Sequence, residues 1–427
     1  MLDGRKLLAR LKGTPLERIL EEARASAERR AESLYVVGGC ARDLVRRAVV
    51  EDLDLVVEGD PAGLGRDLAR RVGGRVLATS LFETCRIQGP AGLRIDVAMS
   101  RRDVYRSPAA LPIVFPAPID EDLRRRDFTI NSLAIALTGP FGGQILDPCG
   151  GLGDLRRGRL RLLHPASLAD DPTRAFRGAR YAARLGLRAA TGWTRAISVA
   201  ESSEAFAKLS PARLRREVEL IGEEVDPGAV VALCGRWDLL PKIDLRLRAK
   251  AELLDALRRL RREHRGASPG SRAAVFVALL AWALPPERRR ALCERLGFEG
   301  AAAREIAGAA AAASRARGLF AGGAPATAAA RIRRAREVAG WDALAVQVAT
   351  AAHGRALGGA LRRERDRWDQ ARPRLKGDRI LALGVARGPR VAALLAALRA
   401  ARYIGAAKTA ADEIELIKGW LGRPRES

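Results

Sequence analysis

Two aspartates separated by one residue are the first candidates for chemistry in this sequence. Asp52 and Asp54 lie in residues 51–57, where acidic and apolar residues alternate and predict a β-strand. Side chains two residues apart on a strand point to the same face, so the two carboxylates should be neighbours. Adjacent carboxylates repel unless a cation lies between them, and hard oxygen ligands suit Mg²⁺ bound together with substrate phosphates. Taken alone, such a pair is better explained by an exposed strand edge that carries acidic residues.

A third aspartate, Asp96, lies in a second strand-like run at residues 93–98, with Ile95 and Val97 beside it. A single acid with apolar neighbours is hard to explain as part of a core, so Asp96 is a candidate third ligand. With three carboxylates, one metal ion can activate an attacking hydroxyl group while a second holds a triphosphate. The sequence therefore predicts a site for two Mg²⁺ ions.

A pair of glycines precedes these aspartates. Gly38 and Gly39 lie between a predicted strand and a predicted helix, where backbone N–H groups and the helix N-terminus can receive a phosphate. Arg42 adds a positive charge in the same segment. Gly-Gly turns between strands and helices are common without any ligand, and this one gains weight because it lies just before the carboxylate pair.

Further along the chain, charged residues recur at every third position: Asp171, Arg174, Arg177 and Arg180. On a helix this spacing forms a nearly continuous stripe, which Arg184 extends. A local explanation exists for the first member, because an aspartate followed by Pro172 is a good helix N-cap. Capping leaves the arginines of the stripe unexplained.

The elements that must position these residues predict an α+β fold. Short β-like runs separated by Gly and Pro occupy residues 34–158, whereas the chain from about residue 168 onward is rich in Ala, Leu and Arg with helical periodicity. Residues 1–33 show amphipathic helical periodicity broken near Gly13 and Pro15. We therefore expect one sheet-containing domain followed by helices.

Composition limits the kind of protein and its partners. Lys and Arg number 76 against 50 Asp and Glu, a net charge of +26 that favours a polyanionic partner such as nucleic acid. The five cysteines form no C-x-x-C pattern, so neither a zinc site nor a disulfide framework is expected. The longest apolar stretch, 273–284, is well short of the roughly 18 residues that indicate a membrane span. We expect a soluble cytoplasmic protein with no membrane association and no obligate protein partner.

Four blocks of the sequence stand in a characteristic order: GGCARDLVRRAVVEDLDLV, RRRDFTINSLAIAL, DPCGGLGDLRRGRLR and DDPTRAFRGARYAARLGL. Together they resemble the class II tRNA nucleotidyltransferase (CCA-adding enzyme) and bacterial poly(A) polymerase family. The blocks cover most of residues 34–190. The rest of the chain resembles the family more loosely, through SPARLRREVEL and KGDRILALGVARGPRVAALL.

The resemblance implies a polymerase-β-like nucleotidyltransferase head domain with a mixed sheet, followed by an all-α neck, body and tail. The expected parts are an N-terminal helical extension at 1–33, the head domain at 34–158, a neck with the nucleotide-selecting helix at 159–225, the body at 226–322 and the tail at 323–427.

The resemblance also implies roles for individual residues. Gly39 and Arg42 would meet the incoming nucleotide, Asp52 and Asp54 would hold the metal ions, and Arg126 or Arg125 would contact the triphosphate. Asp171 and Arg174 would pair with the base. An Asp acceptor beside an Arg donor fits both cytosine and adenine, which each present an amino group next to an unprotonated ring nitrogen.

The activity implied is template-independent addition of C and A, from CTP and ATP, to the 3′ end of tRNA. A poly(A) polymerase, or a partial enzyme that adds only CC or only A, shares the same head-domain motifs. A non-catalytic RNA-binding protein on the same scaffold is the alternative of another class. Such a protein would be expected to have lost a metal-binding carboxylate, and Asp52, Asp54 and Asp96 are all present.

Overall fold

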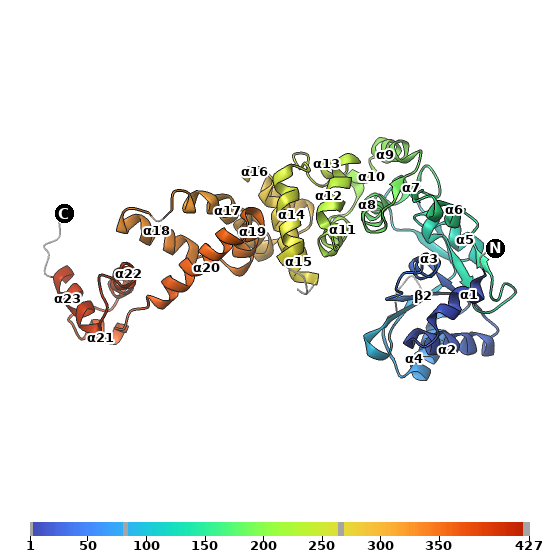
Figure 1. Cartoon of the computed structure of the whole chain (residues 1–427), viewed down its shortest axis with the longest axis horizontal. Coiled ribbons are helices and arrows are strands. Elements are labelled where there is room, and N and C mark those ends of the chain that lie inside the picture. Colours follow the sequence, from blue (N-terminus) through green and yellow to red (C-terminus); the bar gives the residue numbers. More distant parts are fainter. Residues whose placement is uncertain (1–2, 80–83, 264–268, 324, 422–427) are drawn as a thin grey trace. The chain divides into compact units, whose positions relative to one another are not determined.

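The computed structural model describes residues 3–79, 84–263, 269–323 and 325–421 (Figure 1). The chain divides into two compact units, Met1–Glu217 and Val218–Ser427. The first unit holds a mixed β-sheet with helices, and the second is helical in its described residues. The predicted α+β class is confirmed, with the sheet N-terminal to the helices. The finer division into extension, head, neck, body and tail stays a prediction.

The sheet of the first unit has the strand order β3-β4-β5-β2-β1-β8-β9. Its strands are β1 (Ser33–Val37), β2 (Leu53–Glu58), β3 (Arg75–Thr79), β4 (Thr84–Gln88), β5 (Arg94–Met99), β8 (Ala134–Ala136) and β9 (Ile145–Leu146). The central pair β2 and β5 is parallel, and the other neighbours are antiparallel. The strands expected between residues 34 and 99 are therefore present, and the mixed sheet is confirmed.

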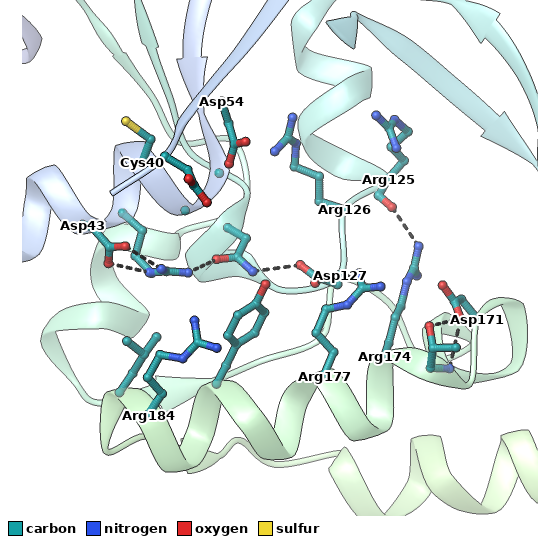
Figure 2. Close-up of a pocket in the computed structure, with 18 of the residues that line it drawn as sticks. Cys40, Asp43, Asp54, Arg125, Arg126, Asp127, Asp171, Arg174, Arg177 and Arg184 are labelled. Atoms are coloured by element: carbon teal, nitrogen blue, oxygen red, sulfur yellow. Dashed lines mark hydrogen bonds and ion pairs between the residues drawn. The ribbon is translucent and has the colours of Figure 1, made fainter. Parts of the chain in front are cut away.

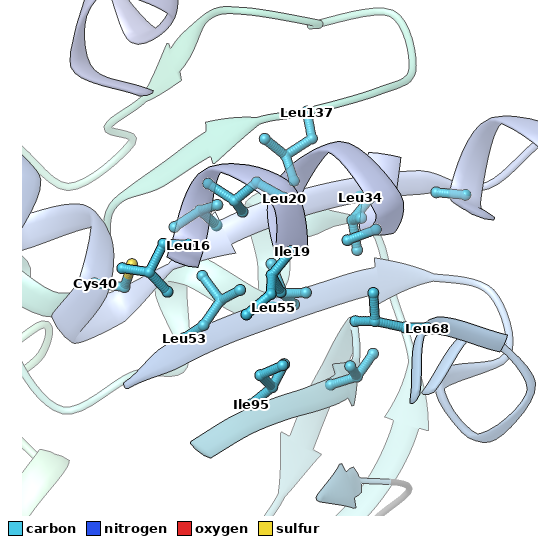
Figure 3. Close-up of a cluster of buried hydrophobic side chains, with 14 of the residues drawn as sticks. Leu16, Ile19, Leu20, Leu34, Cys40, Leu53, Leu55, Leu68, Ile95 and Leu137 are labelled. Atoms are coloured by element: carbon cyan, nitrogen blue, oxygen red, sulfur yellow. The ribbon is translucent and has the colours of Figure 1, made fainter. Parts of the chain in front are cut away.

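Alternation along β2 separates its apolar residues from its polar ones. Leu53, Leu55 and Val57 are buried in the main hydrophobic cluster, which α2 (Pro15–Arg29) and α4 (Pro61–Val72) cover (Figure 3). Val56 belongs to a second cluster on the opposite face of the sheet, where α5 (Ile119–Arg124) packs. Side chains two residues apart on a strand point to the same face, so Asp54 lies on this second face together with Val56, as the sequence predicted.

Residues 4–29 form helices that break where the sequence predicted. The helix α1 (Gly4–Leu8) is followed by a 3₁₀ turn at Ala9–Leu11, and α2 starts directly at Pro15. Ile19 and Leu20 of α2 are buried in the same cluster as the sheet residues (Figure 3). The N-terminal helices are thus part of the packing of the first unit.

The remaining elements of the first unit connect the sheet to a helical region. A small antiparallel pair, β6 (Arg101–Val104) and β7 (Ile113–Pro116), follows β5 directly. Another short pair, β10 (Arg159–Leu160) and β11 (Arg188–Ala189), is parallel. The helices are α3 (Gly38–Arg46), α6 (Gly151–Arg156), α7 (Ser167–Asp170), α8 (Thr173–Leu185), α9 (Trp193–Ser202), α10 (Ala205–Lys208) and α11 (Pro211–Glu223), which runs into the second unit.

The described residues of the second unit form helices, as the periodicity predicted. They are α12 (Pro227–Arg236), α13 (Leu240–Ile243), α14 (Ala251–Glu263), α15 (Pro269–Trp282), α16 (Pro286–Arg295), α17 (Gly300–Phe320), α18 (Ala328–Ala339), α19 (Ala343–His353), α20 (Arg355–Gln370), α21 (Gly377–Leu381), α22 (Pro389–Ile404) and α23 (Ala410–Leu421). Within the described ranges, no helix combines the length and the apolar character needed to cross a bilayer.

Candidate active site

A cavity of about 950 Å³ in the first unit gathers most of the residues singled out from the sequence (Figure 2). Its lining includes the predicted site residues Gly38, Gly39, Arg42, Asp52, Asp54, Arg125, Arg126, Asp171, Arg174 and Arg177. Figure 2 shows Arg174, Arg177 and Arg184 projecting from α8 on one side, with Asp54 and Arg126 on the other. Two predicted residues, Asp96 and Arg180, lie outside this lining.

The turn from β1 to α3 requires a glycine at its first helical position. Gly38 has a φ of +61°, and a Cβ atom there would lie 2.9 Å from Nη1 of Arg126. Its N–H donates to the carbonyl oxygen of Leu133 at 3.1 Å. The Gly38 N–H predicted to receive a phosphate is therefore already bonded, and the close approach of Arg126 is the clearer reason for glycine.

The three candidate metal ligands differ in their partners. Asp54 on β2 is in register with Asp96 on β5. The Asp96 carboxylate pairs with Arg86 Nε at 2.8 Å and with Arg94 Nε at 3.5 Å, and the Asp52 carboxylate pairs with Arg94 Nη2 at 3.0 Å.

Asp54 keeps its carboxylate open. No hydrogen bond or ion pair to this carboxylate is found in the ranges that the structure describes. Burial raises the pKa of Asp54, the nearby Asp96 raises it further, and Arg126 and Arg94 act in the opposite direction. A partly buried carboxylate without a partner beside a cavity suits a cationic ligand.

The donor set fits a Mg²⁺ site built on two carboxylates and substrate phosphates. Asp52 and Asp54 both line the cavity. Among the described residues, no group of three or more His, Cys, Asp or Glu side chains is arranged to hold a metal ion. Direct ligation by Asp96 accordingly stays a prediction. The neighbouring Cys40 is buried, and burial raises the pKa of its thiol, which keeps it protonated.

Arg42 is held firmly at the cavity wall. Its Nη1 donates to Oδ1 of Asn131 at 2.7 Å, and its Nη2 pairs with Asp43 at 2.7 Å. The guanidinium also lies 5.5 Å from the ring centroid of Tyr181. Only 4% of Arg42 is exposed, so it is a preorganised cation in the cavity wall.

A chain of hydrogen bonds links Arg42, through Asn131 and Asp127, to the arginine stripe of α8. Asn131 Nδ2 donates to Oδ1 of Asp127 at 3.0 Å, and Oδ2 of Asp127 accepts from Arg177 Nη1 at 3.3 Å. Arg177 and Arg180 also pair with Glu217, at 3.6 and 3.2 Å. Burial lowers the pKa of Arg177, but Asp127 and Glu217 outweigh it, and the net pKa lies above the ordinary value.

Arg125 and Arg126 share one buried carboxylate. Asp122 is fully buried, and its two oxygens pair with Arg125 Nη2 at 2.6 Å and Arg126 Nη2 at 2.7 Å. Burial alone would raise the pKa of Asp122, but the two guanidinium groups hold it below its ordinary value. Arg125 also pairs with Asp103 at 3.0 Å. Asp122 thus fixes both arginines at the cavity.

Asp171 and Arg174 are the pair implied to read the base, and within the described ranges their side chains make no hydrogen bond to each other, although the backbone N–H of Arg174 donates to the carbonyl oxygen of Asp171 at 3.1 Å. Oδ1 of Asp171 accepts from Arg213 Nη2 at 2.7 Å and from the backbone N–H of Thr173 at 3.0 Å. Nη1 of Arg174 donates to Oγ of Ser167 at 2.7 Å. Nη2 of Arg174 donates to the carbonyl oxygen of Arg125 at 3.0 Å and to the Tyr105 hydroxyl at 3.4 Å, so both terminal nitrogens of Arg174 have partners. Oδ2 of Asp171, in contrast, carries no hydrogen bond within the described ranges.

Sequence reasoning missed several residues that shape the cavity. Asp43, Asp127, Arg213 and Glu217 all line it, and each one orients an arginine or aspartate that had been predicted. Arg213 and Glu217 fall inside the block SPARLRREVEL, whose positions had been given no roles. Asn131, which lies inside the block RRRDFTINSLAIAL, accepts a hydrogen bond from Arg42 and so braces the cavity wall.

Comparisons with known proteins agree on the class that the sheet and the cavity suggest. Residues 34–161 match the family model described as the poly A polymerase head domain. The chain is 31% identical over 392 residues to the CC-adding tRNA nucleotidyltransferase of Deinococcus radiodurans, covering 91% of this chain and 90% of that protein. The chain therefore belongs to the class II tRNA nucleotidyltransferase and poly(A) polymerase head domain family.

Other relatives match over less of their length. The A-adding tRNA nucleotidyltransferase of Halalkalibacterium halodurans is 38% identical over 198 residues, which is 46% of this chain and 46% of that protein. The chain spans less than half the length of this relative and about a quarter or less of the A-adding enzymes of Geobacter sulfurreducens and Aquifex aeolicus. A solved CCA-adding enzyme in an apo form has the same fold, with a TM-score of 0.81 at 23% identity over 98% of this chain and 99% of that one.

Proposed function

We propose that this protein adds C and A nucleotides, from CTP and ATP, to the 3′ end of tRNA without a nucleic-acid template. The observation that carries the proposal is the composition of one cavity. It combines the open carboxylate of Asp54 with the fixed cations Arg42 and Arg126 and with the base-reading candidates Asp171 and Arg174. A metal-dependent nucleotidyl transfer needs these three kinds of group together.

The carboxylates of Asp52 and Asp54 would hold two Mg²⁺ ions, and Asp96 would be the third ligand. When bound, Mg²⁺ would supply charge neutralisation of the triphosphate and activation of the attacking 3′-hydroxyl group. Arg126, whose Nη1 approaches Gly38, would bind triphosphate oxygens, and Asp122 fixes its position. Preorganised cations of this kind stabilise the charge that develops during transfer.

Base selection would use the side chains of Asp171 and Arg174. Oδ2 of Asp171 can accept from the exocyclic amino group that cytosine and adenine share. Arg174 would donate to the adjacent ring nitrogen in place of one of its present contacts, of which the one to the Tyr105 hydroxyl is the longest at 3.4 Å. Uracil and guanine present the opposite pattern and would leave buried polar groups unpaired. Each lost partner costs about 1–3 kcal/mol, which is enough for useful discrimination.

The relatives support a partial activity as the second candidate. The Deinococcus radiodurans relative, aligned along nearly its whole length, is described as a CC-adding enzyme, whereas the three A-adding relatives named above align over 46% of their length or less. All of these specificities are compatible with one cavity that reads C and A. The reaction would take place in the cytoplasm, in keeping with five cysteines that form no disulfide among the described residues.

Product length separates these activities. The substrate is a tRNA transcript lacking its 3′ CCA, incubated with Mg²⁺ and CTP alone, ATP alone, or both. Addition of CC with CTP and of CCA with both nucleotides is the expected result. Arrest at CC with both nucleotides would identify a CC-adding enzyme. No extension of this transcript, together with addition of A to a transcript that already ends in CC, would identify an A-adding one. A long A tract on varied RNAs would indicate a poly(A) polymerase.

A further inference from the structure

One arginine at the edge of the cavity contacts two of the three candidate metal ligands. Arg94 Nη2 lies 3.0 Å from Oδ2 of Asp52, and Arg94 Nε lies 3.5 Å from Oδ2 of Asp96. Arg94 lines the cavity together with Asp52 and Asp54. Among the described residues, no other cation pairs with both Asp52 and Asp96.

The sheet explains why a guanidinium reaches this position. Arg94 and Asp96 are two residues apart on β5 and point to the same face. Asp96 is in register with Asp54 on the parallel neighbour β2, and Asp52 lies just before that strand. Arg94 thus places positive charge among carboxylates that would otherwise repel one another.

We propose that Arg94 is a displaceable counter-ion, which neutralises Asp52 and Asp96 in the metal-free protein and leaves at least Asp52 when Mg²⁺ binds. The inference rests on the proposed function, because it takes Asp52 and Asp54 as the metal-binding carboxylates. Oδ2 of Asp52 faces the guanidinium, so pairing with Arg94 and ligation through that oxygen compete.

Exposure makes this exchange easy. The side chains of Arg94 and Asp52 are 51% and 46% exposed, so their ion pair is screened by water and can open at little cost. The pairs of Arg125 and Arg126 with Asp122 differ, because the Asp122 side chain is 0% exposed. The cavity therefore combines arginines that are fixed with one that can move.

The test measures Mn²⁺ binding to the full-length protein without nucleotide, with free Mn²⁺ quantified by electron paramagnetic resonance. Arg94→Gln removes the competing cation and should tighten Mn²⁺ binding by about 1.4- to fivefold, the range expected for an exposed ion pair. Arg124→Gln is the matched control, since Arg124 makes an exposed pair with Asp120 outside the cavity lining and its loss changes the net charge equally. It should bind Mn²⁺ as the wild type does.

Added KCl gives a second readout. Screening weakens the pairing of Arg94 with Asp52, so the difference between the wild type and Arg94→Gln should shrink as KCl rises. Equal or weaker Mn²⁺ binding by Arg94→Gln, relative to the wild type, would overturn the inference.

Asp54→Asn separates this failure from a failure of the proposed function. If Asp54→Asn loses Mn²⁺ binding while Arg94→Gln binds as the wild type does, the metal site stands and the counter-ion role is wrong. If Asp54→Asn binds Mn²⁺ as tightly as the wild type, the metal site itself is misplaced and the inference falls with it.

Discussion

Charged side chains around the cavity fall into two groups, those that the protein holds with several bonds and those left open. Arg42 and Arg126 belong to the first group, and Asp54 belongs to the second. Fixed cations bind triphosphate oxygens without losing side-chain freedom at the moment of binding. An open, partly buried carboxylate gains most from a metal ion.

Replacing Asn131 with alanine should destabilise the protein and weaken nucleotide use. Asn131 accepts from Arg42 and donates to Asp127, and both Asn131 and Arg42 are buried. Loss of these bonds should lower the free energy of unfolding in urea by about 1–3 kcal/mol. The KM for CTP should rise because Arg42 loses one of its anchors. Ser198→Ala removes an exposed hydroxyl group and should change stability by less than about 0.5 kcal/mol.

Asp122 should make stability depend on acid pH. Its pKa in the folded protein is held below the unfolded value of about 3.9, so the carboxylate stabilises the fold above that pH. This contribution is lost as the pH falls through the folded-state pKa. Asp122→Asn should therefore have a free energy of unfolding lower than that of the wild type by about 3 kcal/mol or more at pH 7. This difference between the two proteins should become smaller below about pH 4. Urea unfolding of both proteins at several pH values measures this difference in free energy. A difference that does not change with pH would contradict the stabilising role of the ionised Asp122 carboxylate.

At the scale of elements, the turn between β1 and α3 brings a phosphate-binding candidate next to the carboxylates. Gly38 adopts a positive φ, whereas Gly39 does not, and a Cβ atom on Gly39 would meet nothing closer than 3.6 Å. Backbone conformation and the position of Arg126 therefore restrict residue 38 far more than residue 39.

Gly38→Ala should destabilise the protein by about 1–2 kcal/mol, the cost of a left-handed conformation for a residue with a Cβ atom. The added methyl group should also displace Arg126 and lower kcat/KM for CTP. Gly39→Ala is the matched control, because alanine fits its helical backbone and should leave the free energy of unfolding unchanged or higher. Thermal unfolding of the two variants distinguishes them, and equal losses in both would contradict this explanation.

Local patterns predicted the elements well, because they depend on neighbouring residues. The period of two placed Asp54 opposite Leu53 and Leu55, and the spacing of three placed Arg174 and Arg177 on one helix. The partners that orient these side chains were not predictable in the same way. Arg42 and Asn131 are 89 residues apart in sequence, so no local pattern connects them.

The packing of the N-terminal helices shows the same limit. Periodicity predicted α2 correctly, but nothing local indicated that Ile19 would be buried with Leu53 and Ile95 of the sheet (Figure 3). Tertiary packing decides which element covers an apolar face. The sequence alone therefore described residues 1–33 as an extension.

At the scale of the whole molecule, the net charge of +26 bears on the substrate. Binding of tRNA through phosphate contacts releases counter-ions, so affinity should fall steeply as salt rises. Fluorescence anisotropy with labelled tRNA between 50 and 200 mM KCl, roughly the range over which such contacts weaken, measures the slope. The Asp54→Ala variant should show the same slope as the wild type. A tRNA complex insensitive to salt would contradict a phosphate-dominated interface.

The central claim is that Asp54 supports nucleotidyl transfer at the cavity and is not needed for binding tRNA. The most direct measurement compares wild type and Asp54→Ala in single-turnover incorporation of CMP into a tRNA transcript lacking its 3′ CCA, with tRNA affinity measured in parallel. Incorporation should be abolished in the variant while affinity for tRNA stays close to the wild type. Incorporation by Asp54→Ala at the wild-type rate would contradict the metal-binding role of Asp54 and the account built on it.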